Sequence, residues 1–421
     1  MKKSSVLSRA GLAAASILGA ILAGILLMTA VYALPTARMR HNVEISLPYI
    51  LTEGDRYQWA PYHNGTELDG FTDSLMLSNA IYEGTGSPLH NALVNPRPEY
   101  TPGDMVPVDS LSRYAQKQEG FREVTYARYW HGYLLLLKPL LLFFTPSDIR
   151  LLNMMVQLIL ACVVLALCRK RGGLRLAIPM GAALLCLNPV STALCLQFTD
   201  VYLLLLTFTA GMLLLETYKK TWGWLLYLWL GILTAFFDFL TYPLAALGVL
   251  LAVEGMLTQG SPWVKSKRML FHSLLWVLGY GAMWAGKWVC ASLLTEQNVI
   301  ADALKNALGR TGAEERMGLF RVIWQNAQNY VNPMGKLLVL LLALVLAYAL
   351  LSKTCRFRLS WRKAAPMLLL ALYPFVWYMA LRNHSMIHAY MTHRNLAVTV
   401  MAVCCAVSLC LEENKKGENN G

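Results

Sequence analysis

Charged residues are scarce in this 421-residue chain, at 14% of the total, whereas a soluble domain averages about 25%. Hydrophobic residues make up 56% of the chain and recur in long runs along its whole length. A helix needs about 20 mostly apolar residues to cross the hydrocarbon core of a bilayer. The composition therefore excludes an ordinary soluble protein and predicts an all-α, polytopic membrane protein.

Cysteine is missing from the two segments that are not apolar. None of the nine cysteines falls within 35–148 or 295–335, so a disulfide framework is excluded there. Ten apolar runs remain as predicted spans, near residues 9–34, 149–168, 174–191, 199–218, 222–238, 240–257, 269–294, 336–352, 364–381 and 395–411. The first run is longer than a typical signal core, and its cleavage site is weak. These features favour a retained anchor over a signal peptide.

Lysine and arginine clusters follow alternate runs. They occur at 2–3, 169–171, 219–220, 265–268, 353–363 and 415–416. By the positive-inside rule, all clusters share one side only if both termini are cytoplasmic. The net charge of +13 is then mostly an orientation signal. A nucleic-acid partner is not expected, because the charges are divided among short loops rather than gathered on one face.

This topology divides the chain into five parts. They are an N-terminal transmembrane anchor (1–34), an extracytoplasmic loop (35–148), transmembrane helices two to seven (149–294), a second, helical extracytoplasmic loop (295–335), and the last three transmembrane helices with a cytoplasmic tail (336–421). We expect the protein to lie in a plasma membrane, of bacterial type, with membrane lipids around it. The sequence does not predict an oligomeric state.

The first outer loop carries two carboxylates four residues apart, in "LDGFTDSLML" at 68–77. Thr72 is placed to cap a helix from Asp73 to about Tyr82. Asp69 would then precede this helix and Asp73 would lie in its first turn. The positive end of the helix dipole favours the ionised form of both acids.

Two further stretches outside the predicted spans have helical patterns. The apolar stretch 133–144, which Lys138–Pro139 interrupts, is too short to span, and it predicts an interfacial helix. Apolar residues at helical spacing in the second outer loop predict two amphipathic helices with a break at 309–312. This pair fits either a lid over a cavity or a solvated hairpin between two spans.

Polar residues gather near the predicted outer ends of the spans. They are Asp238, Lys287, Arg150, the pair Arg128 and His131, and, in "LRNHSMIHAYMTHRN", Arg382, His384, His388 and Arg394. Ionisable groups at membrane depth are costly and are candidates for function. Each also has a simpler interpretation: Arg382 and Arg394 could extend to the interface, and Lys287 could neutralise Asp238. His384 and His388 lack the glutamate of a zinc protease motif, so their spacing alone does not predict a metal site.

An outer loop with an acidic motif, an interfacial stretch and a span that opens on an arginine resembles the GT-C class of membrane glycosyltransferases. The matching strings are "ELDGFTDSLML", "RYWHGYLLLLKPLLLFF" and "IRLLN", with "NHSMIHAYMTHRN" as a late motif. The acids lie further from the first span than in some branches of that class, and no "HPPL"-like string occurs. The resemblance is specific only over about 65–155.

The resemblance implies transfer of a sugar from a polyprenyl-phosphate donor at the outer membrane face. Asp73 or Asp69 would be the catalytic base. Arg150, Lys287, Arg382, Arg394, Arg128, Asp238 and the histidines His131, His384 and His388 would bind the substrate. No cofactor is required, although a divalent cation between the two acids is compatible with this chemistry.

Other functions remain open from the sequence. A transporter or lipid flippase predicts charges near the bilayer midplane and an internal repeat, and neither is evident. A ligase or polymerase of lipid-linked glycans uses similar chemistry but would carry its large loop late in the chain. A scaffold subunit is a further alternative, because a transferase fold can persist without its chemistry.

Overall fold

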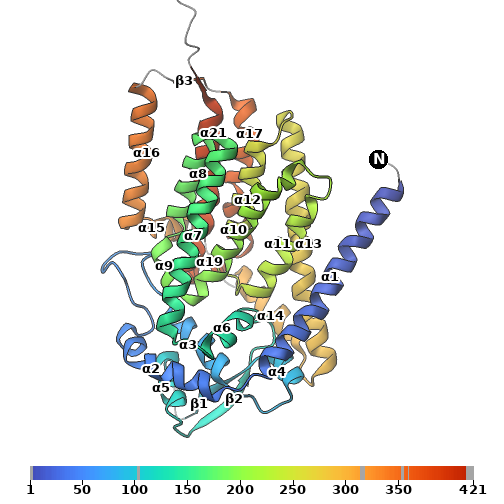
Figure 1. Ribbon diagram of the computed structural model, residues 1–421, viewed down its shortest axis with the longest axis vertical. Coiled ribbons are helices and arrows are strands. Elements are labelled where there is room, and N and C mark those ends of the chain that lie inside the picture. The colour runs from blue at the N-terminus through green and yellow to red at the C-terminus, as the bar shows by residue number, and fades with distance from the viewer. Residues whose placement is uncertain (1–2, 102–104, 313–317, 352–354, 359, 414–421) are drawn as a thin grey trace, which may run out of the picture.

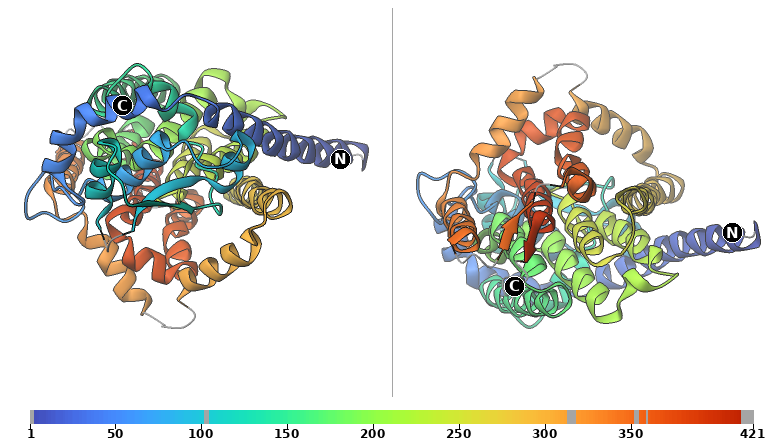
Figure 2. Two further views of the ribbon diagram at one scale, coloured as in Figure 1. Left: turned by 90° about the horizontal axis from the view of Figure 1, so that it is seen from below. Right: turned by 90° about the horizontal axis from the view of Figure 1, so that it is seen from above.

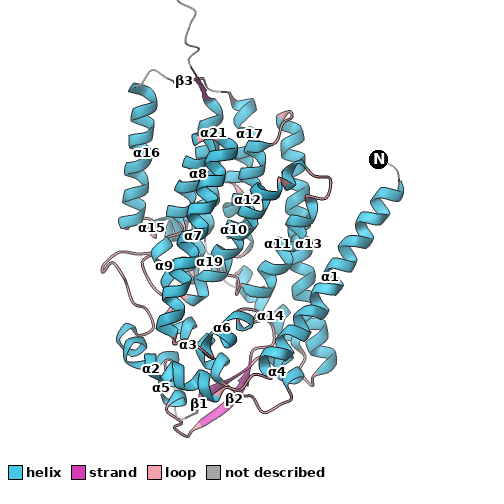
Figure 3. Cartoon of the chain, in the orientation of Figure 1, coloured by secondary structure: helices cyan, strands magenta, loops and turns pink. Residues whose placement is uncertain are grey.

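The computed structural model describes residues 3–101, 105–312, 318–351, 355–358 and 360–413. Most of the described chain is helical, as predicted (Figure 3). Strands occur as two short antiparallel pairs, β1 (Pro96–Tyr100) with β2 (Phe121–Thr125) and β3 (Cys355–Phe357) with β4 (Leu411–Glu413). In the β1–β2 hairpin, Pro96 lies opposite Thr125 and Tyr100 lies opposite Phe121.

The helices form a long bundle and a group of shorter helices at one end of it. The bundle contains α1 (Lys3–Tyr32), α7 (Pro146–Gly172), α8 (Leu174–Cys186), α9 (Pro189–Leu194), α10 (Leu196–Leu215), η1 (Thr217–Lys219), α11 (Trp224–Phe237), α12 (Leu244–Leu257), α13 (Pro262–Leu294), α16 (Pro333–Leu351), α17 (Trp361–Ala371), α18 (Tyr373–Ala380) and α21 (Ala397–Cys410). The shorter helices are α2 (Ala37–Glu53), α3 (Gly70–Ile81), α4 (Pro88–Val94), α5 (Pro107–Ala115), α6 (Leu134–Leu141), α14 (Val299–Thr311), α15 (Leu319–Gln328), α19 (Arg382–Ile387), α20 (Ala389–Thr392) and η2 (His393–Leu396).

Five helical stretches among the described residues are long and apolar enough to cross a membrane. They are Ser8–Tyr32, Pro146–Gly172, Leu196–Leu215, Trp361–Ala380 and Ala389–Cys410. The pair α15–α16, bent by 87°, would add a sixth if it forms one span. The apolar helices α8, α11 and α12 have only 13 or 14 residues, because the runs break near Asn188 and Asp238. The structure is thus consistent with an integral membrane protein, although not all ten predicted runs form long helices.

Close backbone packing joins α11 to α13. A Cβ atom on Gly231 would lie 2.2 Å from the carbonyl oxygen of Trp276, and one on Gly279 would lie 2.3 Å from that of Leu228. Only glycine allows the two helices to approach this closely. In contrast, α1 extends away from the other helices (Figure 2) and exposes leucines along much of its length.

The described residues of the first predicted outer loop, 35–148, fold into a compact group at the end of the bundle opposite β3 (Figure 1). Sequence reasoning missed its first helix, α2, and the hairpin. It also assigned the wrong cap to α3, because the side chain of Asp69, not Thr72, accepts the hydrogen bond from the backbone N–H of residue 72. Within the stretch 133–144, α6 forms as a helix that includes Pro139, and Lys138 is fully buried on it.

The second outer segment forms the two helices that its pattern predicted. The first, α14, ends at Gly312, which adopts a left-handed conformation with a φ of 71° that suits glycine. The second, α15, begins at Leu319. Asn383 donates to the carbonyl oxygen of Gly309 at 2.9 Å and holds the end of α14 near α19.

Candidate functional site

A cavity of about 520 Å³, here called the polar cavity, lies where segments far apart in sequence meet. Its walls come from α3, the β1–β2 hairpin, the stretch 124–133, the end of α14 and the segment 384–391. Its polar side chains are Arg56, Arg97, Arg128, Arg310, His131, His384, His388, Tyr126, Tyr129, Tyr133, Tyr390, Thr72, Thr125, Asn79, Asn95 and Gln197. No aspartate or glutamate is among the described residues that line it. Arginine and tyrosine donors without a carboxylate in the wall suit an anionic ligand.

Three of the four arginines are paired with acids behind the wall. Arg56 lies 3.1 Å from Asp69, Arg97 lies 3.2 Å from Glu99, and Arg128 lies 2.8 Å from Asp302. Each of these three guanidinium groups is therefore partly compensated by a carboxylate.

The fourth arginine, Arg310 at the end of α14, donates to the hydroxyl of Tyr129. In the described part of the chain it makes no ion pair with a carboxylate. Among the described residues, Arg310 is therefore the cavity arginine that no carboxylate compensates.

Buried amides and phenols form one wall of the polar cavity. The amide oxygen of Asn79 accepts from Tyr133 at 3.2 Å and from Tyr32 at 3.4 Å. Asn95 accepts from the ammonium of Lys287 at 2.7 Å. Lys287 is fully buried and also donates to the carbonyl oxygen of Ala92 at 2.8 Å. It therefore supports the wall through Asn95, and these two bonds go to neutral groups rather than to Asp238.

His131 enters the polar cavity from a left-handed backbone conformation, with a φ of 55°. Its ring contacts the hydroxyl of Tyr133 at 3.3 Å and the carbonyl oxygen of Tyr126 at 3.1 Å. Burial, reinforced by the positive charge of Lys287, lowers the pKa of His131 to about 3. The ring is therefore neutral near pH 7, and it can offer a hydrogen bond but not a charge.

His384 and His388 also line the cavity, with ring centroids 4.7 Å apart. His384 contacts the carbonyl oxygen of Leu240 at 2.8 Å, and burial lowers its pKa to about 3. Burial also lowers the pKa of His388. Two polar atoms here, Nδ1 of His388 and Oε1 of Gln197, are buried without a hydrogen-bond partner among the described residues. Unsatisfied groups in a cavity wall are suited to contact a ligand.

Asp69 lies directly behind the polar cavity and is fully buried. One carboxylate oxygen, Oδ2, accepts from the hydroxyl of Tyr390 at 3.1 Å and from that of Thr72 at 2.8 Å. The other, Oδ1, pairs with Arg56. Since Tyr390, Thr72 and Arg56 all line the cavity, Asp69 is one side chain away from its interior.

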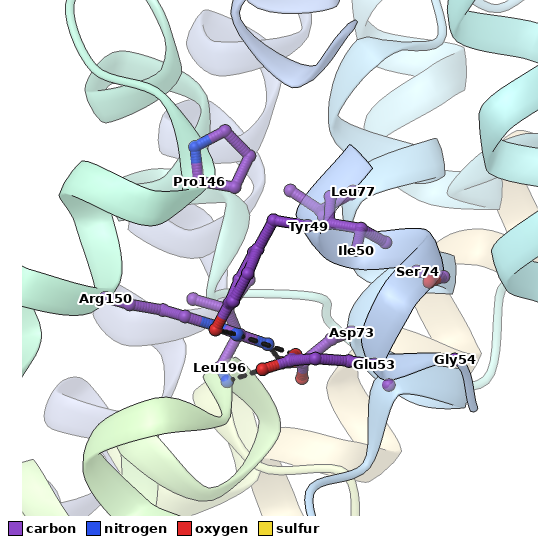
Figure 4. Close-up of a pocket in the computed structure, with 11 residues that line it drawn as sticks. Tyr49, Ile50, Glu53, Gly54, Asp73, Ser74, Leu77, Pro146, Arg150 and Leu196 are labelled. Carbon is purple, nitrogen blue, oxygen red and sulfur yellow. Dashed lines mark hydrogen bonds and ion pairs between the residues drawn. The ribbon is translucent and has the colours of Figure 1, made fainter. Parts of the chain in front are cut away.

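Asp73 points elsewhere, toward the N-terminus of α10. Its two oxygens accept from the backbone N–H groups of Leu196 at 2.9 Å and Gln197 at 3.0 Å. Arg150 lies 3.9 Å away and also binds Glu53, at 2.8 Å. Asp73, Arg150, Glu53 and Leu196 line a small cavity (Figure 4) of about 20 Å³, which is too small for a sugar. Asp73 therefore stabilises the start of α10 in the manner of a helix cap.

Burial also changes the titration of Asp73. It raises the pKa to about 6, and the opposing effects of Arg150 and the two amides compensate only in part. The sequence predicted instead that the dipole of its own helix would favour ionisation. The difference arises because Asp73 is only 4% exposed and its strongest contacts are with another helix.

A second cavity of about 150 Å³, here called the apolar cavity, adjoins the polar one. Leucines of α6, the first turns of α7 and the start of α10 form most of its wall, together with Thr199 and Asp200. Met76 and Tyr133 line both cavities. These two side chains therefore lie between the polar and the apolar cavity.

The remaining candidates from the sequence lie outside the polar cavity. Arg394 is fully buried, donates to the carbonyl oxygens of Leu187 and Tyr390 at 3.2 Å and 2.9 Å, and covers the ring of Phe198. Asp238 accepts from the backbone N–H of Thr241 at 3.1 Å. Arg382 opens α19 and is not among the described lining residues.

Metal ligands do not cluster in the described residues. No group of three or more histidine, cysteine, aspartate or glutamate side chains that could hold a metal ion occurs there. Asp69 and Asp73 share one helix but face different partners, Arg56 and Tyr390 for the first and α10 for the second.

Sequence reasoning found four residues of the polar cavity, Arg128, His131, His384 and His388, and missed Arg56, Arg97, Arg310 and the tyrosines. The missed arginines stand singly in polar stretches, where an isolated charge forms no pattern. The enrichment of tyrosine around 126–133 is visible in the sequence, and it could have indicated this part of the polar cavity.

Comparison of the chain with protein-family models, with curated proteins and with solved structures finds no match.

Proposed function

We propose that the protein is a membrane glycosyltransferase of the GT-C type, which moves a sugar from a polyprenyl-phosphate donor to an acceptor at the outer membrane face. The observation that carries this proposal is the junction of the polar and apolar cavities at Met76 and Tyr133. A phosphate with its sugar fits the arginine- and tyrosine-lined part. The isoprenoid chain fits the leucine-lined part beside α6 and α7, which would lie at the membrane surface.

Among the cationic residues, Arg310 is the best candidate to bind the donor phosphate. It is the cavity arginine for which the described chain shows no carboxylate partner, whereas Arg56, Arg97 and Arg128 are paired. As the bond from the sugar to the phosphate breaks, negative charge develops on the leaving phosphate. A fixed guanidinium stabilises that charge.

Asp69 is the proposed base, and it acts through Tyr390. The acceptor hydroxyl attacks the anomeric carbon, the carbon–oxygen bond to the phosphate breaks, and the acceptor proton passes to the phenol oxygen of Tyr390. The phenol proton moves at the same time to Asp69, to which it is already hydrogen-bonded at 3.1 Å. The products are the glycosylated acceptor, the polyprenyl phosphate and a protonated Asp69.

The donor can be tested by thermal stabilisation of the purified protein with a polyprenyl-phosphate sugar. A ligand that binds the folded state raises the melting temperature. We expect this shift in the unsubstituted protein and its loss in Arg310→Met. Lys305→Met is the matched control, because Lys305 is exposed on the same helix and does not line the cavity. Equal shifts in Arg310→Met and the unsubstituted protein would contradict the assignment of Arg310.

The chemistry needs a separate measurement, the release of polyprenyl phosphate in single-turnover reactions. We expect Asp69→Asn and Tyr390→Phe to keep the donor-induced shift but to slow release by about 10²–10⁴-fold, the usual contribution of general base catalysis. Donor binding without release of polyprenyl phosphate under any condition would refute the transferase and favour a lipid transporter.

A further inference from the structure

A third cavity, here called the outer cavity, has a volume of about 620 Å³. Its described wall comes entirely from the first outer loop, with residues of α3, the β1–β2 hairpin and α5. These elements lie together at the end of the molecule opposite β3 (Figure 1). If the protein is oriented as proposed, this cavity faces the aqueous side.

The outer cavity adjoins the polar cavity. Phe71, Leu75 and Arg97 line both. The guanidinium of Arg56 lies 5.9 Å from the ring centre of Phe71 and 4.0 Å from that of Tyr390. The shared wall is thus next to the Asp69–Tyr390 pair. A molecule in the outer cavity could present one group to the proposed reaction centre.

The chemistry of the wall differs from that of the apolar cavity. The wall of the outer cavity contains the hydroxyls of Ser78 and Ser110 and the partly exposed ring of Phe71. It also contains the carboxylate of Glu99 and the guanidinium of Arg122. Sugars carry hydroxyls on their edges and C–H groups on their faces, so they match donors and acceptors placed beside an apolar ring. A lipid acceptor would need a long apolar wall, such as the one that α6, α7 and α10 form elsewhere.

We infer that the outer cavity is the acceptor site and that the acceptor is a water-soluble glycan rather than a membrane lipid. The assignment of this cavity as the acceptor site rests on the proposed function, whereas the binding of a glycan there does not depend on that function. The chain end of the glycan enters from the hairpin side and passes Arg97 to reach Tyr390.

The test is binding of the detergent-solubilised, full-length protein to an array of neutral and acidic oligosaccharides. Ser110→Trp places an indole in the outer cavity. Asp109→Trp places the same side chain one residue earlier on α5, at an exposed position outside the described lining. We expect Ser110→Trp to weaken glycan binding roughly tenfold or more, as the loss of one or two hydrogen bonds does. Asp109→Trp should bind as the unsubstituted protein does.

The donor-induced thermal shift is measured on the same three proteins. It shows whether each variant is folded and keeps the polar and apolar cavities, in which the donor is proposed to bind. Absence of glycan binding by the unsubstituted protein would overturn the inference, and so would equal binding by Ser110→Trp. Glycan binding that behaves as expected, together with no shift from the polyprenyl-phosphate sugar, would refute the proposed function and leave the outer cavity as a glycan site.

Discussion

The buried carboxyl of Asp73 makes a specific prediction about stability and pH. Its pKa is about 6 in the folded protein against an ordinary value of 3.8. The folded state therefore binds the proton more tightly than the unfolded chain. The contribution of this carboxyl to stability is therefore most favourable at low pH, and it is lost as the pH rises from near the unfolded pKa through the folded one. Asp73→Asn carries no titrating group at this position, so the comparison of the two proteins isolates the effect.

The magnitude follows from the linkage of protonation to folding. With these two pKa values, the carboxyl destabilises the folded state by about 1 kcal/mol at pH 4.5 and by about 3 kcal/mol at pH 7, relative to its neutral form. The stability of the unsubstituted protein should thus fall by about 2 kcal/mol relative to Asp73→Asn over this range. For a chain of this length, that difference corresponds to about 2 °C in melting temperature.

The assay is thermal unfolding in one detergent at a series of pH values, followed by intrinsic fluorescence. All other titrating groups are common to both proteins, so their contributions cancel in the difference. Asp109→Asn, at an exposed position on α5, is the control for a simple change of net charge. Parallel pH profiles for Asp73→Asn and the unsubstituted protein would refute the reasoning, because burial would then impose no cost on the ionised carboxyl.

Three further outcomes are expected. The pKa of His131 is lowered to about 3 in the folded protein, so the folded state binds the proton less tightly than the unfolded chain. The stability that this residue contributes is therefore lost as the pH falls below about 6.5, and His131→Gln should make the melting temperature less sensitive to acid. Arg394→Met should lower the melting temperature, since two buried carbonyl oxygens lose their donor at about 1–3 kcal/mol each, but it should leave the donor-induced shift intact. Gly231→Ala should destabilise by about 1–3 kcal/mol because its Cβ would meet a carbonyl oxygen at 2.2 Å, whereas Gly281→Ala, with nothing within 4 Å, should be neutral or stabilising by up to about 1 kcal/mol.

Local sequence patterns predicted several of the helices. The break between α14 and α15 was predicted from glycine, and the helix after Asp69 was predicted from a capping residue at its start. The prediction did not include α2, because its sequence mixes charged residues with a proline at position 48 and lacks a long apolar run. The proline is tolerated inside that helix, where packing of Met39, Val43 and Leu47 outweighs its weak propensity.

The candidate site was harder to predict because its contacts are long-range. Asp69 meets Tyr390, which lies 321 residues further along the chain, and Arg128 meets Asp302 across 174 residues. A single sequence shows that such residues exist but not which of them face each other. The predicted topology placed the early acids and the late histidines on one side of the membrane, but only the structure shows that Tyr390 of α20 donates a hydrogen bond to Asp69 at the start of α3.

The two acids of the opening motif illustrate how one spacing can give two roles. Asp69 lies one side chain from the polar cavity, whereas Asp73 holds the N-terminus of α10. That N-terminus contributes Gln197 to the polar cavity and Leu196 to the apolar one. Asp73 therefore positions residues of both cavities without touching the reacting atoms in the proposed mechanism. Consequently, Asp73→Asn should change donor affinity more than the rate of chemistry, and Asp69→Asn should do the reverse.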